Sequence, residues 1–228
     1  MKYFIFFLFT TLLYSCKAKA NHILPGNVPV GAKYDRRINL FTKIENGKLS
    51  QWTKEGLLYM DCEVNQNGVL HGYCKTYQKE NRLSSEGRMV NGNKDGLWKW
   101  YFPDGELYIQ QEHNHARKRI YWGDYDKIGN EHGKFEQYYL DGKLEIRGYY
   151  DAGYKTGSWE KYYRNGQLEY RGKFNKDLRT GEWLHYYNTG TLEVKESFDE
   201  AGKVIYRTTY DPEGHEICSV TREKTICR

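Results

Sequence analysis

The stretch Gly157-Ser-Trp159-Glu-Lys-Tyr162-Tyr163-Arg-Asn-Gly166-Gln-Leu168 decides how this chain folds, because similar stretches surround it at a fixed spacing. Copies begin 24 residues before it at Gly133 and 24 residues after it at Gly181, and an earlier copy begins at Gly96. Each copy has an aromatic residue two positions after its first glycine, then two adjacent aromatic residues, a second glycine and a leucine. A fixed period of this length is typical of repeat architectures, in which each unit buries its apolar face against its neighbours.

Each unit contains two short segments in which side chains of two kinds alternate. In the second segment one face carries Leu144, Ile146 and Gly148, and the other carries Glu145 and Arg147. Side-chain direction in a strand has a period of two, so this pattern predicts a half-buried β-strand. The turns between the segments are of the Asp-Gly or Asn-Gly kind, which favours tight hairpins. We therefore predict an all-β fold, an elongated antiparallel meander of repeated β-hairpins with a 24-residue period and no helix in the mature chain.

The spacing predicts how the chain is divided. Residues 71–202 hold the hairpin repeats, with 13 extra residues inserted near 108–129, and a longer hairpin arm would hold them. An insertion in a repeat array is often a binding site, although a tolerated loop is the commoner case. Residues 37–70 resemble degenerate N-terminal repeats or a cap, and residues 203–228 resemble C-terminal capping hairpins, because open arrays need atypical ends to protect their strand edges.

The N-terminal residues predict export and lipid attachment. Residues 1–15 read as a signal peptide, with a positive charge at Lys2 and an apolar run that is too short to span a bilayer. The closing Leu13-Tyr14-Ser15-Cys16 resembles a bacterial lipobox, in which the cysteine becomes diacylated and is the new N-terminus. Residues 16–36 would then be a lipidated tether, and Cys16 the lipid anchor. The tether is basic and lacks an acidic run, which favours the outer membrane with the protein facing the periplasm.

Four cysteines remain after the signal, in a chain expected to meet an oxidising compartment. Cys62 and Cys74 are symmetric about a turn-forming run at Gly68, and Cys218 and Cys227 about Arg222-Glu223. Each pair could face across an antiparallel hairpin, where the Cα separation suits a disulfide. Three pairings are open to four cysteines, and the symmetry favours this one.

The charge pattern and the motifs argue against several kinds of function. A net charge of +5 with both signs interspersed predicts no nucleic-acid partner. His113 and His115 could share a strand face, but no third ligand is placed with them, so we expect no metal and no cofactor. No nucleophile elbow occurs, and carboxylate pairs recur in every repeat, so we expect no enzyme; an envelope hydrolase that uses His113 or His115 is the remaining catalytic alternative.

The phrase Gly-x-Trp-x-x-Tyr-Tyr-x-x-Gly-x-Leu-x-x-x-Gly-x-Tyr resembles the variant MORN repeat of bacterial proteins, including those labelled YwqK-like antitoxins. The resemblance covers about residues 70 to 200, with weaker echoes on both sides. It implies an array of β-hairpins that acts as an interaction module. The antitoxin label does not fix a biochemical activity, and an envelope lipoprotein departs from a cytoplasmic antitoxin.

The face opposite the expected core is the candidate binding surface. It repeats Tyr138, Tyr162 and Tyr186 beside Arg147 and Arg171. Cross-strand stabilisation alone could explain these side chains. The functional interpretation is a platform for an envelope protein partner, on a non-catalytic, lipid-anchored scaffold. The alternatives are a glycan or cell-wall binding module and an immunity-like protein that neutralises an envelope-acting toxin.

Overall fold

A computed structural model describes residues 24–116, 120–122, 125–127, 131–221 and 224–227. Their strands form one 17-stranded sheet and a separate two-stranded sheet. Strands of the large sheet pair antiparallel with their neighbours in chain order, and β8 pairs with β11 across the insertion. The described residues contain a single helical turn, the 3-10 segment Lys79–Asn81. The predicted all-β meander is therefore confirmed.

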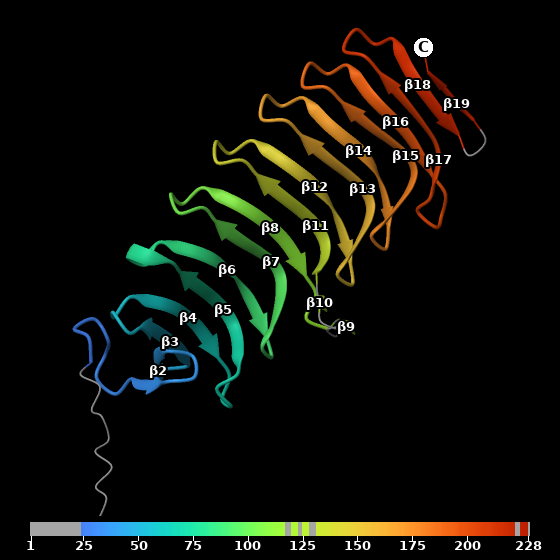
Figure 1. Ribbon diagram of the computed structural model, residues 1–228. Helices are drawn as coiled ribbons and strands as arrows, with labels where there is room; N and C mark the ends of the chain where they lie inside the picture. The colour runs from blue at the N-terminus through green and yellow to red at the C-terminus, as the bar shows by residue number, and fades with distance from the viewer. Residues whose placement is uncertain (1–23, 117–119, 123–124, 128–130, 222–223, 228) are drawn as a thin grey trace, which may run out of the picture.

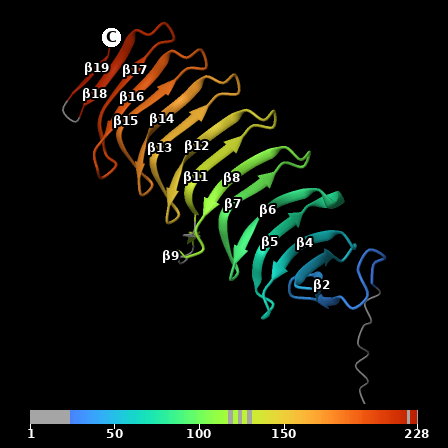
Figure 2. The same ribbon diagram turned by 180° about the vertical axis from the view of Figure 1, so that it is seen from behind.

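The strand bounds show how regular the array is. The large sheet consists of β1 (Lys33–Asp35), β2 (Leu40–Glu45), β3 (Lys48–Thr53), β4 (Leu58–Val64), β5 (Leu70–Tyr77), β6 (Leu83–Val90), β7 (Asn93–Tyr101), β8 (Leu107–His113), β11 (Glu131–Tyr138), β12 (Leu144–Asp151), β13 (Tyr154–Tyr162), β14 (Leu168–Asn175), β15 (Leu178–Tyr186), β16 (Leu192–Phe198), β17 (Val204–Tyr210), β18 (Glu216–Thr221) and β19 (Thr225–Cys227). Figures 1 and 2 show a single curved layer with β2 near one end and β19 at the other. At the β2 end, the segment before β1 packs on the sheet, and its Val28 is buried with Phe41 and Trp52.

The turns differ between the two edges of the array. Between β11 and β12, the amide of Gly142 donates to the carbonyl of Tyr139, and Gly142 has a φ of +77°. This is the Asp-Gly hairpin turn that the sequence predicts. At the other edge, β12 and β13 are joined by Ala152 and Gly153 alone, both with positive φ. Two-residue turns with positive φ at both positions match the right-handed twist of the strands, and they recur at Asn91–Gly92 and Lys176–Asp177.

The core of the array is a lattice of indole rings that lie on glycines. Trp98, Trp159 and Trp183 are at most 3% exposed although the sheet has only one layer. Each ring lies on a glycine of the preceding hairpin, and a Cβ added to that glycine would overlap the ring atoms; the pairs are Gly87 with Trp98, Gly148 with Trp159, and Gly172 with Trp183. The absence of a side chain at these glycines therefore makes room for the indoles.

Hydrogen bonds and neighbouring rings hold each indole in place. The indole N–H of Trp183 donates to the carbonyl of Lys173 at 3.1 Å, and that of Trp98 donates to the carbonyl of Arg88 at 2.8 Å. In both cases the acceptor directly follows the glycine under the ring. The ring of Phe174 lies between Trp159 and Trp183, with centroids 5.9 and 4.9 Å away. The lattice therefore joins each hairpin to the next.

Cationic side chains cover the outer surface of the indole rings. The Lys94 ammonium lies 4.7 Å from the Trp98 ring centroid, and the Lys155 ammonium lies 4.5 Å from that of Trp159. The Arg179 guanidinium lies 4.5 Å from the Trp183 centroid. The aliphatic stems of these residues cover apolar surface while their charged groups face the rings, which explains how the indoles are buried without a second layer.

The two ends of the array carry the disulfides. Cys62 is bonded to Cys74, and Cys218 to Cys227, which is the pairing that the turn symmetry predicts. Cys74 occupies the position that tryptophan takes in later hairpins, and Cys62 the position of the glycine. A covalent bond therefore replaces the ring–glycine contact in this early hairpin.

Two short strands of the insertion lie outside the large sheet. They include β9 (Ile120–Trp122) and β10 (Tyr125–Lys127), which pair with each other in the two-stranded sheet. Figure 1 shows this small hairpin at the edge of the array, beside the ends of β8 and β11. The structure thus agrees with the expected hairpin arm: β8 and β11 pair antiparallel, and between them in the chain β9 and β10 form a further hairpin, in a two-stranded sheet of its own.

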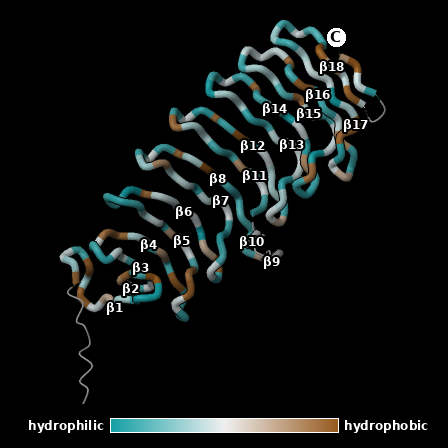
Figure 3. Tube along the Cα trace, in the orientation of Figure 1, coloured by the Kyte–Doolittle hydropathy of each residue, from teal (hydrophilic) through white to brown (hydrophobic). Residues whose placement is uncertain are grey.

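The distribution of apolar residues suits this single layer. Figure 3 shows short apolar and polar stretches that interleave along the strands. Within the described residues, no helix is long and apolar enough to cross a membrane. The predicted signal peptide and Cys16 lie outside the described residues.

We predict that Gly148→Ala destabilises the array, because the added methyl group overlaps the Trp159 ring. Overpacking of this kind costs about 1–3 kcal/mol, measured as the free energy of unfolding in urea. The control is Gly148→Ala combined with Trp159→Phe, in which the smaller ring leaves room for the methyl group, so part of the loss is recovered. Unchanged stability of Gly148→Ala alone would contradict the close contact.

Candidate functional site

A row of tyrosines runs along one edge of the array. Successive hairpins place a tyrosine at the last position of one strand, and the members are Tyr77, Tyr101, Tyr138, Tyr162, Tyr186 and Tyr210. Three of them were predicted from the sequence. The spacing of 24 from Tyr186 to Tyr210 and from Tyr77 to Tyr101 is the signal that identifies the others. We call these residues the tyrosine row.

Three hydroxyl groups of the row are held by carboxylates of the same sheet. The hydroxyl of Tyr162 donates to Glu160 at 2.6 Å, and that of Tyr138 donates to Glu136 at 2.9 Å. The hydroxyl of Tyr101 donates to Glu86 on the neighbouring strand at 2.6 Å. Charge-assisted hydrogen bonds of this kind fix the orientation of the rings. The row is therefore partly ordered before any partner arrives.

The predicted arginines occupy different environments on this face. Arg147 donates to Glu160 at 2.6 Å, and its guanidinium lies 5.7 Å from the ring centroid of Tyr162. Arg171 is exposed and pairs in register with Glu160 from the other side. The structure thus brings Arg147, Tyr162 and Arg171 together around one carboxylate. Tyr138 and Tyr186 lie one hairpin away on either side.

The pKa values of this face reflect these contacts. Burial, followed by the hydrogen bond to Glu136, raises the pKa of Tyr138 to about 12, so its hydroxyl remains a donor at neutral pH. Burial by itself raises the pKa of Glu160, but hydrogen bonds from Tyr162 and Arg147 and the nearby positive charges lower it overall. The same balance lowers the pKa of Glu86 and Glu136.

The second tyrosine of each Tyr-Tyr pair has a structural role. The hydroxyl of Tyr139 donates to the carbonyl of Tyr162 at 2.8 Å, and the hydroxyl of Tyr163 donates to the carbonyl of Tyr186 at 2.8 Å. Tyr187 does the same with Tyr210 at 2.8 Å. Each bond joins one hairpin to the tyrosine row of the next, so the spacing of the row is set by the backbone.

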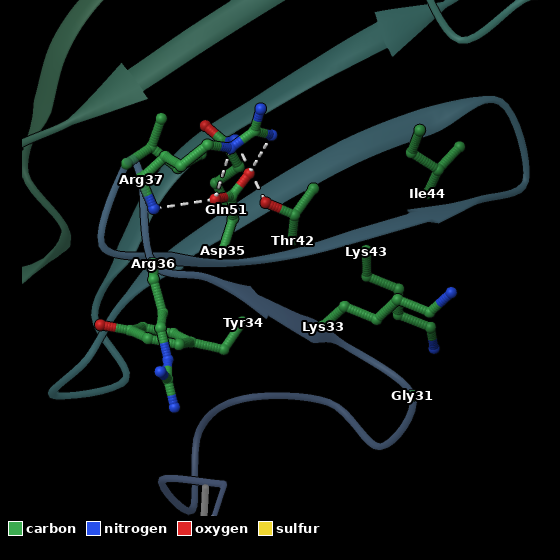
Figure 4. Close-up of a pocket in the computed structure, with 11 residues that line it drawn as sticks. Gly31, Lys33, Tyr34, Asp35, Arg36, Arg37, Thr42, Lys43, Ile44 and Gln51 are labelled. Atoms are coloured by element: carbon green, nitrogen blue, oxygen red, sulfur yellow. Dashed lines mark hydrogen bonds and ion pairs between the residues drawn. The ribbon is translucent and has the colours of Figure 1, made fainter. Parts of the chain in front are cut away.

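A hollow of about 790 Å³ lies at the N-terminal end of the array. Figure 4 shows basic side chains around it, with Arg37 turned onto Asp35. Another of its cations, Lys43, lies 2.8 Å from Glu45. Arg37 and Lys43 are thus paired with acidic neighbours, whereas Lys33 and Arg36 add positive charge to this open surface.

A smaller pocket of about 280 Å³ lies where β8 meets β11. We call it the junction pocket; it is lined by Lys94, Trp100, Tyr108, Ile109, Gln111, His113, Glu131, Phe135 and Tyr150. Burial raises the pKa of Glu131 and lowers that of Lys94, and each charge partly opposes the shift of the other. The pocket therefore has one acidic and one basic group in a partly desolvated setting.

One amide in the junction pocket is incompletely bonded. Gln111 is 3% exposed, and its Nε2 donates to the carbonyl of Glu112 at 2.6 Å. Its Oε1 has no hydrogen-bond partner among the described residues. A buried acceptor in this state costs about 1–3 kcal/mol. The sequence signal for this site is the replacement of a lattice glycine by glutamine.

The two histidines of the possible metal site differ in burial and in their contacts. His113 is buried at 7% exposure beside Trp100, whereas His115 is exposed, with its Nδ1 2.6 Å from Asp95. Among the described residues, no group of three or more His, Cys, Asp or Glu side chains could hold a metal ion. These histidines therefore do not form a joint site in the described part of the chain.

Comparison with known proteins identifies the repeat. Residues 94–115, 131–152, 155–176 and 179–199 match the family model described as MORN repeat variant. Each match covers one hairpin: β7–β8, β11–β12, β13–β14 and β15–β16. No curated protein matches this chain.

Solved structures share only weak likeness with the chain. They include a GtfA/B complex (14% identity over 59% of this chain and 20% of that chain, TM-score 0.21) and a GtfA/B complex bound to UDP and GlcNAc (12% over 51% and 26%, TM-score 0.19). A third is TcdB2-TccC3 (11% over 82% and 14%, TM-score 0.22). The chain thus spans about a quarter or less of each of these chains, and likeness at this level supports no functional argument.

We predict that acid destabilises the protein by protonating the carboxylates that accept hydrogen bonds from the tyrosine row. The pKa values of Glu86, Glu136 and Glu160 are lowered in the folded state, so the unfolded state binds more protons as the pH falls below about 5. Their contribution is complete above the unfolded pKa and is lost as the pH falls through the folded pKa. Melting temperatures from pH 7 to pH 3 measure this loss. Glu160→Gln should flatten the dependence, and an unchanged slope would contradict the assignment.

Proposed function

Four hairpins of this chain, at residues 94–115, 131–152, 155–176 and 179–199, match the variant MORN repeat, and on that premise we propose that the protein is a non-catalytic scaffold that binds a protein partner through the tyrosine row. We further propose that lipid on Cys16 holds it at the bacterial membrane, on the periplasmic side of the outer membrane. The observation that carries the binding proposal is the row itself, in which carboxylates of the same sheet hold the hydroxyls of Tyr138 and Tyr162.

The chemistry of the row suits a protein interface. Tyrosine and arginine are enriched in interfaces, because each combines a large contact area with polar groups. Ordering these side chains before binding reduces the entropy that association must overcome. Tyr149 and Tyr73 are 51% and 47% exposed on the same face, which adds aromatic surface. The regular spacing favours a partner that presents an extended segment across several hairpins.

The repeated chemistry also supports a non-catalytic role. The Tyr-Glu pair of Tyr138 and Glu136 recurs one hairpin later as Tyr162 and Glu160. A catalytic site needs one particular set of groups with pKa values moved apart, whereas this set recurs with the lattice. Repetition of this kind is expected of a binding face.

The position of the N-terminus suits a membrane anchor. The described chain begins at Leu24 beside β1 and β2, at one end of the array. An anchor at Cys16 would therefore hold that end near the bilayer while the tyrosine row extends away from it. Acylation by more than one chain provides stable attachment.

We predict that replacing Tyr138, Tyr162 and Tyr186 together by Ala abolishes capture of the partner from detergent-solubilised envelopes. The matched control replaces the same three tyrosines by Phe, which keeps the rings and removes the hydroxyls, so capture is retained. The fluorescence of Trp98, Trp159 and Trp183 on the other face reports folding in each variant. Capture of the same protein at equal yield by the folded Ala variant would contradict the proposal.

We predict that Cys16→Ser moves the protein from the membrane fraction to the soluble fraction, because the acyl chains have no attachment site. Labelling with radioactive palmitate should mark the wild type and not the variant. Cys62→Ser is the control, since that cysteine is bonded to Cys74 and lies far along the chain. A membrane-bound Cys16→Ser protein would exclude this anchor.

A further inference from the structure

The indole–glycine lattice is interrupted where β8 meets β11. At this place Gln111 occupies the glycine position and Phe135 occupies the tryptophan position, and the two residues pair in register. Glutamine is larger than glycine and a phenyl ring is smaller than an indole, so the packing of the other hairpins cannot form. The junction pocket, with a volume of about 280 Å³, lies at this interruption.

One buried acceptor that lines the pocket lacks a hydrogen-bond donor in the described part of the chain. The Oε1 of Gln111 has no hydrogen-bond partner among the described residues, although the side chain is only 3% exposed. This oxygen is enclosed in the structure, so a ligand reaches it once the Gln111 side chain turns toward the pocket. Buried polar groups are stable when they are hydrogen-bonded, so an N–H or O–H group of a ligand would favour that turn.

The rest of the lining limits the chemistry of the ligand. The rings of Trp100, Phe135 and Tyr150 supply apolar walls, while Lys94 on β7 and Glu131 on β11 supply one charge of each sign. A simple anion would meet Glu131, and a simple cation would meet Lys94. A purely apolar molecule would leave Gln111 Oε1 without a donor. The volume lies near the lower end of the range for small-molecule sites.

We propose that the junction pocket binds a single saccharide unit. Sugar hydroxyls can donate to Gln111 Oε1 and to Glu131, and can accept from Lys94, without a net charge. The C–H face of a pyranose ring can pack on the aromatic walls at the same time. This site is separate from the tyrosine row, which lies on the opposite face of the sheet, so neither proposal depends on the other.

The insertion is placed to influence this site. His113 ends β8 and Glu131 begins β11, so the residues at both ends of the insertion line the pocket. The ring–glycine packing and the 24-residue period are thus interrupted at the same place. Insertions in repeat arrays map to loops on one face, which is often the binding face.

The test is saturation-transfer NMR with glucose, galactose, glucosamine and N-acetylglucosamine as probes, together with choline and benzoate as charged non-sugar probes. The full-length wild-type protein should show saturable transfer from at least one sugar. Gln111→Leu should weaken that binding at least tenfold and leave the melting temperature unchanged or higher, because an unbonded buried acceptor is removed. Gln137→Leu, on the neighbouring strand but outside the pocket, should bind like the wild type.

A second variant keeps the test independent of Gln111 alone. Gln111→Gly combined with Phe135→Trp restores the lattice pair of the other hairpins, so it should fold, fill the pocket and abolish sugar binding. Absence of saturable binding by every sugar, equal binding by Gln111→Leu, or binding of choline or benzoate without any sugar would each overturn the proposal.

Discussion

The contact between an indole ring and a glycine of the preceding hairpin is the constraint on which the rest of this structure depends. A single-layer sheet has no second layer to cover its apolar side chains, so each hairpin must cover those of its neighbour. Trp159 on Gly148 and Trp183 on Gly172 do this, and Lys155 and Arg179 cover the outer side of the rings. The resulting array propagates by nearest-neighbour contacts.

Because one face completes the core, the other face can present polar side chains without a loss of packing. The hydroxyl bonds from Tyr163 to the next hairpin fix the spacing, and the bond from Tyr162 to Glu160 fixes a ring of the row. The regularity of the tyrosine row is thus a consequence of the same period that builds the core. Where the lattice is interrupted, at Gln111 and Phe135, the array gains a pocket instead.

The sequence predicts the fold well because the period of 24 and the alternation within each segment record backbone geometry directly. It predicts the pairing of Cys62 with Cys74, because symmetry about a turn places two residues opposite each other. It misses the junction pocket, because the pocket forms only where β8 and β11 pack side by side. These strands are separated in sequence by the 18 positions from His113, at the end of β8, to Glu131, at the start of β11. The sequence locates the insertion from the excess over the period, but it does not show that β9 and β10 form a separate two-stranded sheet.

Native-state hydrogen exchange resolved by strand tests most directly whether the indole–glycine contact holds the array together. Local opening reflects local packing, so strands joined by the contact should open less readily than strands without it. The account predicts that amides between β8 and β11, where Gln111 and Phe135 replace the pair, exchange faster than those between β12 and β13 or between β14 and β15. Equal or greater protection at the β8–β11 junction would contradict it.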